Sequence, residues 1–370
     1  MFMSSNPTLA GGVQEHILHL SKQLRENGHS VTIFGPKPAK NRFAQYKAMG
    51  EKVYFPLPNG TQSNVHILGT TDLPETVFTQ KKFDIVHIHE PYIPFAAWTV
   101  LEKSTIPIVG TFHTAWDNES FFNIFNSFVP LFKDRFSSFT DGAIFVSKIT
   151  FEKWKPMCNK SVLKNIIPNA VDTSLFEPKK SINKMIHLLF AARLVQRKGL
   201  YQLLKALVIL KNKGYRFILT VMGDGDEKNQ DLNFIKNNKL QTYIRYMGEI
   251  KGAERSKYFK EADVFCAPYV NEAASISVLE AVSSGLVIAG YNIPIFSDLL
   301  KDYPGKELLT QKTDIALARA LEKIMRDTDI IHKIKKWCIK KRETFSWITV
   351  AKQTETHYYQ VLKKYEKKNS

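Results

Sequence analysis

A basic loop, Arg193-Leu194-Val195-Gln196-Arg197-Lys198-Gly199, follows an apolar run of the length of a buried strand. Arg193 offers a planar pair of donors and Lys198 a compact positive charge, so the two can converge on a diphosphate. When a sugar–phosphate bond breaks, preorganised cations facing the departing phosphate lower the barrier. The loop therefore indicates phosphate chemistry, and a solvated basic loop is the alternative.

Two carboxylates stand eight residues apart, Glu272 in a loop after a strand and Glu280 within the next helix. Eight residues of helix rise about 12 Å, so the two can hold opposite ends of one extended ligand. That separation is too large for a glycosidase acid/base pair acting on one bond. A solvated helix glutamate is the alternative for Glu280.

Histidines mark two further strand ends. His113 follows the strand before Gly110-Thr111-Phe112, and ligands of open α/β sheets bind beyond the carboxyl ends of strands. Its imidazole can bond a sugar hydroxyl or simply satisfy nearby backbone. His87 and His89, at i and i+2, share one face of a strand. A metal bound there needs further ligands that the sequence does not place, and we predict no metal site.

A glycine pair, Gly11-Gly12, lies between the first apolar residues and an amphipathic helix. Adjacent glycines let backbone approach a ligand, and a helix N-terminus presents free N–H groups to an anion. A turn with no ligand is the alternative. Only Met1–Ser4 precede this loop as a strand, so the first strand is either very short or lacks residues at the chain start.

The elements that must position these loops are short apolar strands alternating with amphipathic helices, which predicts parallel sheets covered on both faces. Val13–Asn27 has helical spacing and ends at Gly28. The expected strands are Ser30–Phe34, Asp84–His89, Pro107–Phe112, Gly142–Val146, Met185–Ala191, Phe217–Met222, Tyr243–Met247, Val264–Ala267 and Val287–Ala289.

The chain length of 370 residues predicts two domains. The expected linker is Asn169–Asn183, which sets an N-terminal domain over 1–175 and a C-terminal domain over 176–345. Residues 346–370 are expected to form a helix that crosses back to the N-terminal domain. The fold class is α/β, with two Rossmann-like doubly wound domains facing a deep cleft.

Composition narrows the class of protein. Apolar residues make up 44% and charged residues 24%, which suits a globular chain without membrane spans. Three scattered cysteines and no leader-like N-terminus favour the cytoplasm. The net charge of +17 can attract anionic lipid, phosphorylated ligands or nucleic acid. No zinc-finger or RNA-binding motif is present, so nucleic acid is not an expected partner.

The order of these motifs resembles that of the retaining GT-B glycosyltransferases, and among them it looks most like the bacterial phosphatidylinositol mannosyltransferases. The resemblance runs from about Gly11 to Gly290 and includes the histidine strand ends, the basic loop and the two glutamates. It implies a nucleotide diphosphate sugar as donor, GDP- or UDP-linked, and no cofactor or metal.

What the resemblance implies for the chemistry can be carried over residue by residue. Arg193 and Lys198 look like the pair that stabilises the leaving phosphates, and His113 looks like the histidine that contacts the transferred sugar. Glu272 resembles the carboxylate that holds the sugar near C3 and C4. The resemblance also implies the residues that bind the donor. Gly12 would contact the diphosphate, Ile250 the nucleobase and Glu280 the ribose. The further implied donor-binding residues are Gly223, Ser275 and Ile276. The implied acceptor-side residues are Gln14 and Asn59.

Departures from the family pattern bear on activity and specificity. Ala274 and Ser275 stand where the family usually has Phe-Gly, and Ser275 is expected at the N-cap of the next helix. Ala170 stands where Gly is usual, and Gly252 where guanine-binding relatives often have an acid. The lysine and arginine that help hold inositol phosphate in the mannosyltransferases have no counterpart here.

The expected activity is transfer of a mannose- or glucose-type hexose, with retention, to a hydroxyl of a lipid or lipid-linked glycan. The expected location is cytoplasmic, with peripheral attachment to an anionic surface on the inner face of the cell membrane. A catalytically impaired GT-B scaffold is the alternative. A nicotinamide-dependent oxidoreductase is disfavoured because Gly11-Gly12 does not extend to Gly-x-Gly-x-x-Gly.

Overall fold

The computed structural model of the chain describes residues 1–3, 12–37, 44–49, 51–56, 62–67, 82–93, 96–114, 136, 140–179, 181–272 and 274–369. These residues form two compact units, one made of 1–169 with 347–370 and the other of 170–346. The chain thus crosses between the units twice, after Asn169 and after Ser346.

The first unit contains a seven-stranded parallel sheet in the order β3-β2-β1-β6-β7-β8-β9. Its strands are β1 (Phe2–Met3), β2 (Ile33–Gly35), β3 (Tyr46–Ala48), β6 (Val86–His89), β7 (Ile108–Phe112), β8 (Gly142–Phe145) and β9 (Leu163–Ile166). A separate antiparallel hairpin joins β4 (Glu51–Pro56) to β5 (Gln62–Ile67). The strand order reverses between β1 and β6, which makes their carboxyl ends a topological switch point.

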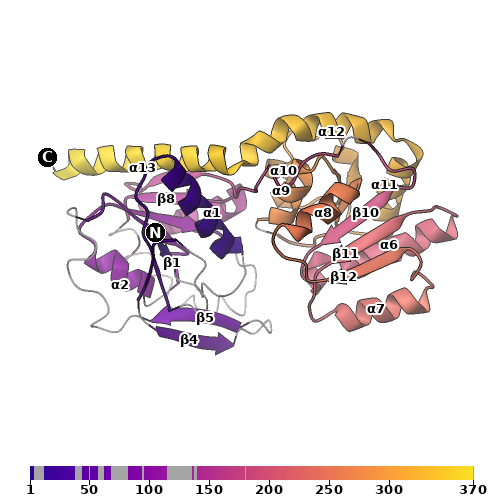
Figure 1. Ribbon diagram of the computed structural model, residues 1–370, viewed down its shortest axis with the longest axis horizontal. Coiled ribbons are helices and arrows are strands. Elements are labelled where there is room, and N and C mark those ends of the chain that lie inside the picture. The colour runs from indigo at the N-terminus through magenta and orange to yellow at the C-terminus, as the bar shows by residue number, and fades with distance from the viewer. Residues whose placement is uncertain are drawn as a thin grey trace. The chain divides into compact units, whose positions relative to one another are not determined.

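Helices cover both faces of this sheet because successive side chains of a strand point to opposite faces. Phe2 packs with α2 (Ala96–Lys103) in one apolar cluster, whereas Met3 packs with Ile17 of α1 (Gly12–Glu26) in another. The long helix α13 (Trp347–Asn369) lies beside α1 and over β8 (Figure 1). The short helices α5 (Lys148–Trp154) and η1 (Lys155–Met157) complete the unit among the described residues.

The second unit contains a six-stranded parallel sheet in the order β12-β11-β10-β13-β14-β15. Its strands are β10 (His187–Ala191), β11 (Ile218–Met222), β12 (Ile244–Gly248), β13 (Val264–Ala267), β14 (Val287–Tyr291) and β15 (Leu309–Thr310). Strand order reverses between β10 and β13, the second switch point. All residues of β10, β13 and β14 are buried, as expected for central strands covered on both faces.

Figure 1 shows α8 and α9 to one side of β10 to β12, and α6 and α7 to the other. The α-helices of this unit are α6 (Leu200–Asn212), α7 (Lys228–Asn237), α8 (Glu254–Glu261), α9 (Ile276–Ser283), α10 (Pro294–Leu299), α11 (Asp314–Arg326) and α12 (Asp329–Lys341). Its 3-10 turns are η2 (Gln196–Lys198), η3 (Lys306–Leu308) and η4 (Arg342–Phe345).

The α/β class and the two Rossmann-like units predicted from the sequence are confirmed. Each expected strand overlaps a strand of the structure, and the first helix ends at Glu26, two residues before Gly28, whose φ is +96°. The sequence prediction missed the edge strands β3, β9 and β15, which are mostly half-exposed and lack an apolar run. No helix in the described part of the chain is both long and apolar enough to cross a bilayer.

Candidate functional site

In the second unit, two loops leave the carboxyl ends of β10 and β13, on either side of the switch point. The basic loop Arg193–Gly199 follows β10, and Pro268–Ser275 connects β13 to α9. The backbone N–H of Val270 donates to the Arg197 carbonyl oxygen at 2.8 Å, which ties the loops together. Open α/β sheets bind ligands at such a crevice, so the predicted basic and acidic residues lie where a ligand is expected.

Lys198 and Glu272, 74 residues apart, meet at this crevice as an ion pair. The Lys198 ammonium also lies 4.2 Å from the centre of the Tyr269 ring, whose side chain is fully buried. Burial lowers the pKa of Lys198, and Arg193 and Arg197 add to the effect, while Glu272 opposes it. The lysine is therefore held as a partly desolvated charge between a carboxylate and an aromatic face.

The two arginines of the basic loop differ in their contacts. Arg197 is half-exposed, and its Nη1 lies 3.4 Å from Glu272 Oε2. Arg193 is exposed, close enough to Lys198 to lower its pKa, and makes no ion pair or side-chain hydrogen bond with any residue that the structure describes. Its guanidinium is thus available to an anion at the carboxyl end of β10.

Two glycines let these loops pack closely. Gly199 has a φ of +72°, and a Cβ there would lie 2.1 Å from the Pro268 carbonyl oxygen. Gly223, after β11, has a φ of +148°, and its Cβ would lie 1.9 Å from the Ala192 carbonyl oxygen. Any side chain at either position would push the loops apart. Gly223, predicted as a donor-binding residue, therefore supports the backbone immediately before Arg193.

Helix α9 begins as the sequence predicted, with Ser275 at its N-cap. The Ser275 hydroxyl makes no capping bond to the first turn, although the residue is buried. Ile276, the first helical residue, is half-buried. The Ser275 hydroxyl and the N–H groups of the first turn thus lie together at the N-terminus of α9. This helix end is in the same loop after β13 that contains Glu272.

Glu280 is buried on α9 and is held by Arg255 of α8, a residue that the sequence analysis missed. Arg255 Nε donates to both carboxylate oxygens at 3.0 and 2.9 Å, and Nη2 donates to Oε2 at 2.8 Å. Nη2 also donates to Ser277 Oγ at 2.9 Å. Burial acts to lower the pKa of Arg255, but the Glu280 carboxylate raises it overall. Glu280 is therefore no solvated helix glutamate, and its remaining lone pairs are oriented by Arg255.

In the first unit, His113 is buried and directly follows β7. It lies at the edge of the sheet where the neighbouring strand β6 also ends. Its backbone N–H donates to Glu90 Oε1 at 2.9 Å, and the Thr114 hydroxyl donates to Glu90 Oε2 at 3.3 Å. Glu90 has a φ of +60°, a strained value for a non-glycine residue, and burial raises its pKa to about 8. Glu90 therefore fixes the backbone at His113. Like Arg255, it was missed by the sequence analysis.

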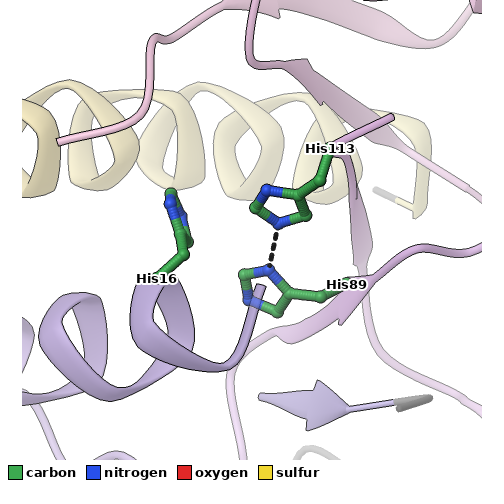
Figure 2. Close-up of side chains that lie close together, drawn as sticks. All are labelled: His16, His89 and His113. Carbon is green, nitrogen blue, oxygen red and sulfur yellow. Dashed lines mark hydrogen bonds between the residues drawn. The ribbon is translucent and has the colours of Figure 1, made fainter. Parts of the chain in front are cut away.

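Four buried histidines gather at this point. The rings of His87 and His89 lie on one face of β6, as predicted, with centroids 4.2 Å apart. Both nitrogens of His87 are engaged, with Thr111 Oγ1 at 2.6 Å and the Tyr358 hydroxyl at 2.5 Å. His89 Nδ1 instead meets His113 Nε2 at 3.0 Å, and His16 of α1 stands edge-on to both rings (Figure 2). The sequence indicated His113 and His89, but not His16.

The other predicted residues are placed as follows. Gly12 is exposed at the first position of α1, and Gln14 is buried on the same helix. Ile250 is half-buried just after β12. Gly11, Asn59 and Ala273 lie outside the described residues.

Two family models together match most of the chain. Residues 10–175 match "Glycosyltransferase Family 4", and residues 172–341 match "Glycosyl transferases group 1". Their junction falls near the point where the chain leaves the first unit.

Curated relatives are similar over nearly the whole chain. A phosphatidyl-myo-inositol mannosyltransferase of Mycolicibacterium smegmatis is 27% identical over 86% of this chain and 82% of its own length. One component of the phosphatidylinositol N-acetylglucosaminyltransferase of Arabidopsis thaliana is 26% identical over 95% of this chain and 79% of its own. An alpha-monoglucosyldiacylglycerol synthase of Acholeplasma laidlawii is 23% identical over 100% and 98%.

Solved structures share the fold at low identity. Sucrose-phosphate synthase from Thermosynechococcus elongatus superposes with a TM-score of 0.73 at 17% identity, over 97% of this chain and 98% of that one. Anabaena HepE in complex with UDP superposes with a TM-score of 0.74 at 14% identity, over 97% and 99%.

Proposed function

Because this chain belongs to the GT-B glycosyltransferases, we propose that it transfers a mannose- or glucose-type hexose from a nucleotide diphosphate sugar to a hydroxyl of a lipid or lipid-linked glycan. The observation that carries the proposal is the convergence of Lys198 and Glu272 at the switch point of the second sheet. A cation and a carboxylate brought together there match a diphosphate joined to a polyhydroxylated ring.

In the proposed reaction, the bond between the anomeric carbon and the β-phosphate oxygen breaks, and a bond from that carbon to the acceptor oxygen forms on the same face. The acceptor proton passes to the leaving phosphate oxygen. Lys198 and Arg193 stabilise the negative charge that develops on the diphosphate. Because this charge is neutralised by side chains, the step requires no metal ion.

The remaining residues position the donor. Glu272 accepts hydrogen bonds from sugar hydroxyls, and Glu280, oriented by Arg255, accepts them from the ribose. The N–H groups at the start of α9, with the Ser275 hydroxyl, suit a phosphate. His113, held by Glu90, is neutral near pH 7 because burial keeps its pKa well below the usual value, so it bonds a sugar hydroxyl without adding charge.

The acceptor side of the proposal draws on the relatives, whose names specify phosphatidylinositol and diacylglycerol-type lipids. Gln14 and Asn59 are its proposed acceptor residues, and Gly12 and Ile250 complete the donor set as proposed contacts for diphosphate and base. Attachment to a membrane surface is proposed as peripheral, from the cytoplasmic side.

A thermal-shift and turnover screen tests the proposal. The full chain is incubated with GDP-mannose, UDP-glucose, UDP-N-acetylglucosamine and the free nucleotides, and matching donors are then assayed for transfer to phosphatidylinositol and diacylglycerol. We expect one nucleotide series to stabilise the protein and its sugar donor to be consumed. If no nucleotide sugar binds, the proposal is wrong.

A non-catalytic GT-B scaffold remains the second candidate, favoured by Ser275 at the position where the family has glycine. A side chain at this position leaves the backbone less room to approach the phosphates than glycine does. Nucleotide binding without donor hydrolysis or transfer to any acceptor would identify the scaffold.

A further inference from the structure

We infer that His16, His89 and His113 form a binding site for a transition-metal ion of the zinc and cobalt class. The three side chains come from α1, β6 and the loop after β7, and they converge at the switch point of the first sheet (Figure 2). One nitrogen of each lies within 4.8 Å of the other two. All three residues are buried, with at most 6% of their surface exposed.

The distances are close to those of an occupied site. His89 Nδ1 and His113 Nε2 are 3.0 Å apart, whereas two nitrogens bound tetrahedrally at about 2.0–2.1 Å from zinc are separated by roughly 3.3 Å. The nitrogen of His16 lies within 4.8 Å of the other two, so this third ligand must approach the His89–His113 pair to complete a three-histidine site.

The ligand chemistry selects the metal. Three imidazole nitrogens suit zinc, cobalt, nickel or copper, whereas magnesium and calcium prefer oxygen ligands. Each ring offers one nitrogen to the group, and a neutral imidazole binds a metal through such a nitrogen. Metal coordination replaces the His89–His113 hydrogen bond, and the proton of that bond moves to the other nitrogen of its own ring, so none is released.

Two further buried polar groups adjoin the three histidines. Glu90 places a buried carboxyl group directly after His89, and one of its oxygens accepts a hydrogen bond from the His113 backbone N–H. Buried Asn169 lies beside His16 and His113, and its Oδ1 has no hydrogen-bond partner among the described residues. That oxygen can take the fourth position or orient a metal-bound water. His87 is no ligand, because Thr111 and Tyr358 occupy its nitrogens.

The functional consequence rests on the proposed transferase activity. A metal on His113 Nε2 holds the ring that we assign to the donor sugar. Zinc is therefore expected to inhibit transfer, and a chelator to restore it. Metal binding itself is measured without any substrate, so failure of the metal site and failure of the transferase proposal are distinguishable.

The test uses the full chain, stripped with EDTA and then equilibrated with Co²⁺ or Zn²⁺. We expect about one metal ion to stay bound after gel filtration, the intense visible absorption of four-coordinate Co²⁺, and no retention of Mg²⁺. His16→Ala and His16→Gln should each weaken Co²⁺ binding by about 100-fold or more, since loss of an outer partner alone typically costs 10–100-fold.

The matched control is His332→Ala, because His332 is an exposed histidine of α12 in the second unit. Circular dichroism checks that each variant is folded. A wild-type chain that retains neither Co²⁺ nor Zn²⁺ would overturn the inference without reference to any variant. Equal binding by the folded His16 variants and by His332→Ala would overturn it as well.

Discussion

At the scale of single residues, the candidate donor site contains two ion pairs, to which we assign the diphosphate with its sugar and the ribose hydroxyls. Lys198 meets Glu272 at the carboxyl ends of β10 and β13, and Arg255 meets Glu280 between α8 and α9. Each pair joins a cation and a carboxylate that are both largely buried. Breaking either pair by truncating one partner leaves an uncompensated charge, so variants need a stability control.

Truncation of Arg193 and Lys198 is expected to reduce turnover, and thermal unfolding checks that each variant is folded, because Lys198→Ala takes the ammonium away from Glu272. Arg193→Ala and Lys198→Ala should each lower the transfer rate by about 10²-fold or more, the scale typical of a lost transition-state donor. Steady-state transfer and donor hydrolysis measure the effect. Arg216→Ala and Lys205→Ala, both exposed positions of the same unit, are the matched controls. Unchanged rates in purified Arg193→Ala and Lys198→Ala would remove both residues from the mechanism.

The two glutamates are expected to differ in what they bind. Glu280→Ala should weaken binding of the nucleoside diphosphate alone, whereas Glu272→Ala should mainly reduce sugar transfer. Arg255→Ala should share the loss of Glu280→Ala, because Arg255 orients that carboxylate. Calorimetry with the nucleoside diphosphate separates the two ends, since this ligand has no sugar. Equal affinity losses for Glu272→Ala and Glu280→Ala would contradict the division.

At the scale of elements, loop packing at the strand ends decides where the side chains of the candidate site lie. The Ala192 carbonyl oxygen packs against Gly223, and the Leu194 carbonyl oxygen packs against Gly225. The loop that follows β11 therefore supports the start of the basic loop. Both glycines have φ values that other residues rarely adopt. The position of Arg193 thus depends on a neighbouring strand that carries no reactive group.

Gly223→Ala is expected to destabilise the second unit by roughly 2–4 kcal/mol, because it adds a backbone clash to an unfavourable φ. Gly214→Ala is the matched control: its φ is +83°, but nothing lies within 4 Å of the added Cβ. That control should cost only about 1–2 kcal/mol. Thermal and denaturant unfolding compare the variants. Equal losses at the two positions would show that the contact with Ala192 contributes nothing.

Asp231 on α7 is expected to give the second unit a pH-dependent stability. Burial, with the nearby Glu227 charge, raises the pKa of this carboxyl to about 7, while an unfolded Asp titrates near 3.9. The folded state therefore binds more protons between these values, so its stability falls as pH rises from about 4 to about 7. Asp231→Asn should remove this loss and raise the unfolding temperature at pH 8. A variant with the pH profile of the wild type would refute the assignment.

At the scale of the whole molecule, part of the basic excess lies exposed on α12, away from the loops of the proposed donor site in the chain. Lys333, Lys336 and Lys340 are exposed on α12, with Ile339 47% exposed among them. Each basic group near an anionic surface contributes about 1 kcal/mol within a Debye length. The tryptophans of the C-terminal segment pack within the protein instead, Trp337 on Tyr303 and Trp347 on His19.

We expect salt-sensitive, peripheral binding to anionic vesicles. The wild type should sediment with liposomes rich in phosphatidylglycerol at low salt and dissociate at high salt. Replacement of Lys333, Lys336 and Lys340 by Glu should release it, because α12 then presents negative charge.

A control variant with the same change of net charge has Glu in place of Lys205, Lys236 and Lys257, which are exposed on α6, α7 and α8. These residues should matter less if α12 is the binding face. A wild-type protein that stays in the supernatant at low salt would make a soluble acceptor the better proposal.

The sequence by itself determined the class of fold and pointed to the loops that we propose for the reaction. Both follow from local patterns: buried parallel strands read as short apolar runs, and Arg193, Lys198, Glu272 and His113 each follow such a run. Family resemblance assigned the glutamates opposite ends of a donor, but spacing alone could not show that Glu280 is buried and paired.

Only the tertiary structure showed that Arg255, Glu90 and His16 contact the residues of the candidate sites. Arg255 lies 25 residues from Glu280 in the chain, and Glu90 lies 23 residues from the His113 N–H group that it accepts. No periodicity or motif links such pairs, because their contacts arise where separate strand ends and helices are packed together. The order of strands, which reverses between β1 and β6 and between β10 and β13, decided which of the candidate residues meet.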